Sequence, residues 1–138
     1  MKERYLFRAK RKDSGEWVFG GLSYCEKTGA YFITNMGKDH ISYIGFHQEV
    51  DPDTICQCTG LKDKNGNLIW ENDIVAYWDS YSTESGLAEA DCIGKVVWDD
   101  ETISFQVTNR LSAESYEVLD DECSVIGNTF DNPELLEV

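Results

Sequence analysis

The sequence predicts an all-β protein with little helix, and three observations lead to that prediction. Aromatic residues make up 12% of the 138 residues. Val, Ile, Tyr and Trp occur in short clusters separated by Gly, Asn and Asp, which is typical of strands bounded by turns. Several clusters alternate apolar and polar residues, as half-buried strands do. No apolar run approaches the roughly 18 residues that a membrane-spanning helix needs, so we expect strands joined by short turns.

The N-terminal β-region, residues 1–55, is expected to form a β-hairpin followed by a meander. YLFRAK and EWVFGGL flank the turn RKDSG, in which Gly15 can adopt the positive φ that the turn needs. We interpret Tyr5, Phe7 and Trp17 as the buried face of this hairpin. AYFITNM and HISYIGFHQEV are predicted to be the next two strands, before the polar break VDPDT.

The C-terminal region, residues 56–138, shows strand signals about every eight to twelve residues, which is typical of a barrel. It could share one core with the N-terminal region. The strand TICQC leads into LKDKNGNLIW, where Asn65-Gly66 predicts a hairpin loop. DIVAYW is predicted to be a strand. Residues 79–91, DSYSTESGLAEAD, are interpreted as an exposed loop because Ser, Glu and Ala dominate them.

Three further segments complete the C-terminal region. CIGKVVWDDETISFQV is predicted to form two strands around the acidic turn DDET, and SVIGNTF is predicted to be a last strand. In the tail NPELLEV, Pro133 stands just inside a possible helix start and Asn132 could cap it. We therefore expect one helical turn at the end of the chain.

The charge is strongly negative and unevenly distributed. The formal net charge is −14; residues 1–20 carry six Lys or Arg against three acids, whereas residues 71–138 carry two against seventeen. So acidic an end repels the phosphate backbone of nucleic acids at long range. Three interpretations stay open: a solvated acidic surface, an acidic patch that meets the basic N-terminal segment of the same or a neighbouring subunit, and an imitation of DNA.

The cysteines and the N-terminus point to a cytoplasmic protein. The cysteines form an odd and scattered set, which makes a poor disulfide framework. The start MKERYLFRAKRKD lacks the apolar segment of an export signal. We expect reduced thiols at Cys25, Cys56, Cys58, Cys92 and Cys123.

Candidate metal-binding groups are few. Cys56 and Cys58 place two thiols on one face of a strand, and His40 and His47 lie nearby in the sequence. A second Cys or His pair with the spacing of a structural zinc site does not follow. We predict that the chain binds no metal and no cofactor.

Catalytic motifs are also missing from the sequence. It contains neither the nucleophile motif G-x-S-x-G nor the metal motif H-E-x-x-H. Acids that are adjacent on a turn do not converge from separate strands, as a hydrolytic site requires. We therefore predict no catalytic residues and no enzyme activity. Three acidic groups are interpreted as solvated turns: Asp51 with Asp53, Glu71 with Asp73, and Asp99 with Asp100 and Glu101.

A possible binding surface lies in the N-terminal hairpin, where basic residues alternate with aromatic ones. Cations can hold a nucleic-acid backbone while bases stack on aromatic rings, so such a hairpin could bind single strands. The net charge opposes that role, and the sequence favours a protein partner over nucleic acid. The predicted surface consists of Arg4, Arg8, Lys10, Arg11, Lys12 and Trp17.

Three blocks of the sequence, in order and spacing, resemble the YopX family of phage and prophage proteins. They are TGLKDKNGNLIWENDIVAYW, IGKVVWDD and VIGNTFDNPELL, and the opening RYLFRAKRKDSGEWVFGGL is also similar. Asn72 stands where the family usually has Gly; because Asn tolerates positive φ, that corner should survive. The resemblance implies a β-rich fold whose C-terminal part is an SH3-like barrel-type subdomain. It carries no set of catalytic residues.

The resemblance also implies an accessory protein encoded by a phage or prophage, acting in the cytoplasm of a bacterial host. We predict a non-enzymatic protein-interaction module that forms a homo-oligomer and can bind a host or phage protein. Two alternatives stay open. One is an acidic DNA mimic that inhibits a host DNA-binding protein, and the other is a single-stranded nucleic-acid binder that uses the basic hairpin.

Overall fold

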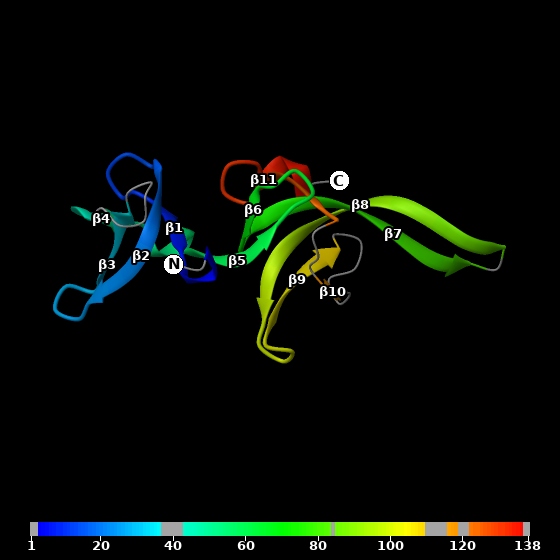
Figure 1. Ribbon diagram of the computed structural model, residues 1–138, viewed down its shortest axis with the longest axis horizontal. Coiled ribbons are helices and arrows are strands. Elements are labelled where there is room, and N and C mark those ends of the chain that lie inside the picture. Colours follow the sequence, from blue (N-terminus) through cyan, green and yellow to red (C-terminus); the bar gives the residue numbers. More distant parts are fainter. Residues whose placement is uncertain (1–2, 37–42, 84, 110–115, 119–121, 137–138) are drawn as a thin grey trace. The chain divides into compact units, whose positions relative to one another are not determined.

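The computed structural model describes residues 3–36, 43–83, 85–109, 116–118 and 122–136 (Figure 1). These residues form antiparallel strands and three short 3-10 helices, and the prediction of an all-β fold with little helix is confirmed. The chain divides into two units, Met1–Gly60 and Leu61–Val138. Each unit has its own cluster of buried side chains.

The first unit is built on an antiparallel sheet with the strand order β4-β3-β2-β1-β5 (Figure 1). The predicted hairpin joins β1 to β2, and Gly15 in its turn has the expected positive φ, 74°. Residues 40–42 of the predicted strand HISYIGFHQEV lie outside the described residues. The elements are η1 Glu3–Tyr5, β1 Phe7–Lys10, β2 Trp17–Cys25, β3 Ala30–Met36, β4 Tyr43–Val50, η2 Pro52–Thr54 and β5 Cys56–Lys62.

The core of the first unit lies on the Ala9 side of the sheet, which corrects the prediction for the hairpin aromatics. Ala9 and Val18 face each other across β1 and β2 and are buried. Directly opposite residues share one face of a sheet, and neighbours along a strand alternate between faces. Trp17 therefore lies on the other face, half-buried, and Tyr5 is 54% exposed in η1. Phe7 packs against the core as expected.

The first sheet curls until the end of β4 meets the chain that follows β1. Arg11 and Val50 form an isolated antiparallel bridge. The Lys12 N–H donates to the Glu49 carbonyl over 3.0 Å, and the Asp51 N–H donates to the Lys10 carbonyl over 2.9 Å. This curl satisfies backbone groups at the edge of β4 that would otherwise be open to further strands.

The second unit contains an antiparallel sheet with the order β10-β9-β8-β7-β11 (Figure 1). Before it, β6 pairs with β5 in the predicted LKDKNGNLIW hairpin, and Gly66 in the turn has φ 84°. Because β10 and β11 stand at opposite ends of the order, the sheet is open in the described residues, and the SH3-like barrel stays a prediction. The elements are β6 Leu68–Trp70, β7 Asp73–Thr83, β8 Gly86–Asp99, β9 Ser104–Asn109, β10 Tyr116–Val118, β11 Ser124–Asn128 and η3 Pro133–Leu136.

The predicted helical turn at the end of the chain is confirmed as η3, but Asn132 does not cap it with its side chain in the way we expected. Its backbone carbonyl accepts the Leu135 N–H over 3.1 Å. Its side-chain oxygen instead accepts the Asn128 N–H over 3.3 Å. Asn132 therefore ties the tail back to the end of β11.

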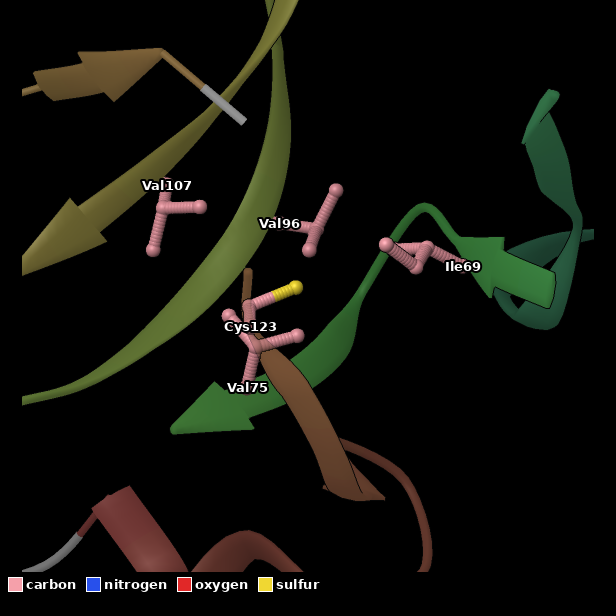
Figure 2. Close-up of a cluster of buried hydrophobic side chains, with 5 residues drawn as sticks. All are labelled: Ile69, Val75, Val96, Val107 and Cys123. Carbon is pink, nitrogen blue, oxygen red and sulfur yellow. The ribbon is translucent and has the colours of Figure 1, made fainter. Parts of the chain in front are cut away.

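The core of the second unit gathers one apolar side chain from nearly every strand. Figure 2 shows these side chains directed toward a common interior. Four of them come from β6, β7, β8 and β9, and the fifth belongs to the residue just before β11. They are Ile69, Val75, Val96, Val107 and Cys123.

The predicted exposed loop at residues 79–91 is wrong, because most of this segment belongs to β7 and β8. The two strands pair continuously from Ile74 opposite Lys95 to Thr83 opposite Gly86. They run on together past β9 and β11 as a two-stranded ribbon (Figure 1). Pairing satisfies the backbone groups between the two strands of a ribbon, and water can satisfy the outer ones. Such a ribbon needs no apolar composition, and composition alone suggested a loop.

The carboxylate of Asp63 holds the β5–β6 turn and β11 together. Asp63 is 5% exposed. Its Oδ1 accepts the N–H groups of Asn65 and Asn67 over 2.9 and 2.8 Å, and its Oδ2 accepts the N–H of Val125 over 2.9 Å. Burial alone would raise the pKa of this carboxyl, but the N–H groups of Val125, Asn67 and Asn65 stabilise the anion and lower the pKa below its ordinary value.

We predict that Asp63→Ala lowers the free energy of unfolding by about 2–4 kcal/mol, because buried N–H donors lose their acceptor. The pH dependence follows from the lowered pKa. Asp63 stabilises the fold fully above its unfolded pKa, near 3.8, and this stabilisation is lost as the pH falls through the lower folded value. Urea unfolding between pH 7 and pH 2 should show a flatter profile for Asp63→Asn than for the unsubstituted chain.

The matched control for this prediction is Asp53→Asn, which changes an exposed aspartate in η2. It removes the same formal charge without removing an acceptor of three backbone N–H groups. Equal effects of Asp53→Asn and Asp63→Asn on the unfolding midpoint would contradict the role given to Asp63.

Candidate interaction surfaces

Of the six residues predicted to form the basic surface, Arg8 and Lys10 lie in contact with Trp17. Arg8 and Lys10 lie on β1, and Trp17 begins β2 directly opposite Lys10. The guanidinium carbon of Arg8 lies 4.7 Å from the centroid of the Trp17 ring, and the Lys10 Nζ lies 5.4 Å from it. Both distances are within the range of a cation–π contact. The indole therefore already contacts two cations of its own chain.

The other predicted cations have acidic or aromatic neighbours. Arg11 and Asp13 form an ion pair at 2.8 Å, and Lys12 pairs with Glu49 at 3.1 Å. Arg4 lies in η1, where its guanidinium donates to the Tyr5 hydroxyl over 2.9 Å. These contacts are exposed, so they are weak and readily exchanged for an external anion.

Two neighbouring recesses in the first unit share His47. One, of about 470 Å³, is lined by Arg11, Lys12, Asp13, His47, Gln48 and Glu49. The other, of about 350 Å³, is mainly apolar and is lined by Ser23, Tyr24, Cys25, Phe32 and His47. The rings of Phe32 and His47 meet edge to face with their centroids 6.4 Å apart. Sequence patterns did not indicate either recess, because the residues that line them come from different strands.

Cys25 gives the apolar recess a thiol on its wall. It ends β2, and a hydrogen bond from the Thr28 side chain, with the backbone N–H groups of Thr28 and Lys27, lowers the pKa of the thiol. Thiolates are the reactive form of cysteine. This position is therefore a suitable point for chemical crosslinking.

The cysteine pair Cys56 and Cys58 is buried in β5. His47 lies on β4, and His40 lies outside the described residues. Among the residues that the structure describes, three or more metal-ligating side chains do not gather at any point. No helix in this part of the chain has the length and apolar character to cross a membrane.

The acidic groups serve the backbone around them. Asp51 accepts the Asp53 N–H over 3.0 Å and caps η2. Asp99 accepts the Glu101 N–H over 3.0 Å in the β8–β9 turn. Asp73 is 2% exposed and accepts the Trp70 N–H over 2.8 Å. The interpretation of Asp73 as a solvated turn residue is therefore wrong, because its carboxylate fastens the corner between β6 and β7.

The residues that carry the family resemblance shape corners and close contacts. Asn72 has φ 69°, as expected for a position where glycine is usual. Its N–H donates to the Val96 carbonyl over 2.8 Å, and its carbonyl accepts the Thr129 N–H over 3.0 Å. At Gly94 an added Cβ would lie 2.4 Å from the Thr108 carbonyl oxygen, so any side chain there would push β8 from β9.

The turn between β8 and β9 presents apolar side chains that sequence reasoning missed. Ile103 is 74% exposed and has φ 53°, and Trp98 is 42% exposed. Trp98 packs edge to face on Phe105, with centroids 5.0 Å apart, and its Nε1 donates to Asp100 over 2.8 Å. The predicted acidic turn DDET is present, but it is followed directly by an exposed isoleucine. The isoleucine that directly follows this polar turn was the one sequence feature that could have indicated the exposed apolar surface.

Comparison with known proteins identifies the family. The family model described as YopX protein matches residues 6–137. No curated protein matches the chain. Among solved structures, the crystal structure of protein EF1440 from Enterococcus faecalis is similar, with 27% sequence identity over 95% of this chain and 96% of that chain and a TM-score of 0.48. Because the family model covers nearly the whole sequence, the chain belongs to the YopX family.

Proposed function

We propose that this YopX-family chain is a non-enzymatic protein-interaction module. It acts as a phage or prophage accessory protein in the cytoplasm of a bacterial host. The carboxylates that could suggest hydrolysis support this proposal, since Asp51, Asp73 and Asp99 each accept a backbone N–H. A carboxylate used in this way stabilises a turn.

The observation that carries the proposal is the β7–β8 ribbon. In the described residues, β11 pairs with β7 only over Asp73–Ala76, and β9 pairs with β8 only over Gly94–Asp99. From Trp78 opposite Asp91 to the tip, the two strands pair with each other and with no further strand of the described chain. Two-stranded ribbons are marginally stable in water, and their outer edges are templates for the strand of a partner.

Self-association is the second part of the proposal. The basic segment at residues 1–20 and the acidic half at residues 71–138 can attract each other between copies. Host or phage proteins are the proposed partners of the ribbon.

We predict that shortening the ribbon removes the heterologous partner. Asn-Gly in place of residues 79–90 joins Trp78 to Asp91, which are cross-strand neighbours, through a two-residue hairpin turn. The tagged full-length and shortened chains are compared by quantitative mass spectrometry after capture from host lysate. We expect proteins held by the full chain to be lost from the shortened one.

The control for ribbon shortening is the unfolding transition, which should persist because the core of the second unit lies outside the deleted segment. Recovery of the same proteins in equal amounts by both chains would contradict the proposal. Salt-sensitive recovery of a host DNA-binding enzyme would favour the DNA-mimic alternative.

We infer that nucleic acid is not the partner, because the net charge of −14 repels the phosphate backbone and because Arg8 and Lys10 already contact Trp17. Fluorescence polarisation with a labelled single-stranded oligonucleotide should show no affinity at physiological salt. Binding that Arg8→Ala with Lys10→Ala removes would overturn this inference. The control is Lys27→Ala with Lys64→Ala, which makes the same charge change at two exposed lysines elsewhere.

A further inference from the structure

Ile103 is held in a costly conformation with its side chain in solvent. A β-branched residue at φ 53° is disfavoured, and Gly or Asn would adopt this conformation more easily. The side chain is nevertheless 74% exposed, so it is not placed there to fill a core.

A hydrogen-bond network fixes the turn that presents Ile103. Asp99 accepts the Glu101 N–H over 3.0 Å and the Thr102 hydroxyl over 3.1 Å. The Gln106 amide donates to the Thr102 hydroxyl over 2.9 Å. The turn is therefore rigid on both sides of the isoleucine. Strained residues that are held in place by many surrounding contacts are typical of recognition sites.

The surroundings of Ile103 combine apolar surface with negative charge. Trp98 adds a second exposed apolar side chain beside the turn, packed on Phe105. Asp99, Asp100 and Glu101 precede Ile103 within four residues. This β8–β9 tip matches a recess that is apolar inside and has exposed cations at its rim.

The first unit has such a recess. The apolar recess lined by Ser23, Tyr24, Cys25, Phe32 and His47 has a volume of about 350 Å³. Through His47 it adjoins the recess that Arg11 and Lys12 line together with Asp13 and Glu49, and residues 1–20 around it carry a net charge of +3. Both cations pair with acids at the surface, with side-chain exposures of 32% and 66%, and exposed pairs exchange partners at little cost.

We propose that the β8–β9 tip of one copy inserts Ile103 into the apolar recess of a second copy, while the acids of the tip face Arg11 and Lys12 there. This inference deepens the self-association proposed above. The contact joins two different patches, so it is heterologous and builds chains or rings of copies. Association should weaken as salt rises, because the charged rim is exposed.

Cys25 in the recess wall makes the contact directly testable. Ile103→Cys places a thiol at the tip, and mild oxidation should produce disulfide-linked oligomers through Cys25 of a second copy. Peptide mapping should identify the bond between positions 25 and 103. The bond should be absent when Cys25→Ser is combined with Ile103→Cys.

The control for crosslinking is Ile126→Cys, at a position on β11 that is 41% exposed. It offers an exposed thiol away from the tip and should form no bond with Cys25. Failure of Ile103→Cys to crosslink with Cys25, or equal crosslinking from position 126, would overturn the inference.

Sedimentation provides a second, independent readout. Ile103→Asn keeps a residue that tolerates positive φ, so the fold should persist, and self-association should weaken by about tenfold or more because apolar burial is lost. Ile126→Asn should leave association unchanged. A monomer at high micromolar concentration and low salt would overturn self-association altogether. Oligomers that are indifferent to Ile103→Asn would overturn only this contact, and partner capture through the ribbon would still stand.

Discussion

The buried carboxylate of Asp63 is the interaction on which the second unit depends. An ionised group this far from water is costly unless donors surround it. Here the N–H groups of Asn65, Asn67 and Val125 take the place of water. One side chain thus forms the β5–β6 turn and fixes β11 beside it. The Lys64 N–H, which donates to the Cys123 carbonyl over 3.0 Å, joins the same two segments. Cys123, which directly precedes β11, belongs to the core shown in Figure 2, so holding β11 in place also positions this core residue.

The other residues that characterise the family also stabilise turns and close contacts between strands. Asn72 turns the chain at positive φ, and its backbone forms hydrogen bonds with Val96 and Thr129. The Asp73 carboxylate accepts the Trp70 N–H. Gly94 has no side chain, which allows β8 to lie close to β9. Each has a structural task that a different side chain would disturb. Recognition is then assigned to the ribbon, which lies between two of these blocks, and to the β8–β9 tip, which begins within the block IGKVVWDD. The β7–β8 ribbon and the β8–β9 tip both project from the sheet that the family residues assemble.

Local conformation was predictable from the sequence, and long-range contacts were not. Gly15, Gly66 and Asn72 have the positive φ values that turn chemistry predicts, because tolerance of that conformation belongs to the residue itself. The bond from Val125 to Asp63 joins residues 62 apart, and no local pattern encodes it. The ribbon was missed because its polar composition resembles a loop.

The candidate surfaces show the same limit. The alternation of basic and aromatic residues placed Arg8, Lys10 and Trp17 near each other correctly. It assigned Trp17 to the buried face, since the register that sets Ala9 opposite Val18 was not known. The recess around Phe32 and His47 needs three strands to form, and Ile103 stands where turn chemistry predicts Gly or Asn. Native-state hydrogen exchange of the Val125 amide tests the central claim most directly. This N–H donates to Asp63, so it should exchange only through global unfolding, with the same opening free energy as the amides of Val75 and Val96 in the core strands. Fast exchange of Val125 while Val75 and Val96 stay protected would contradict the account.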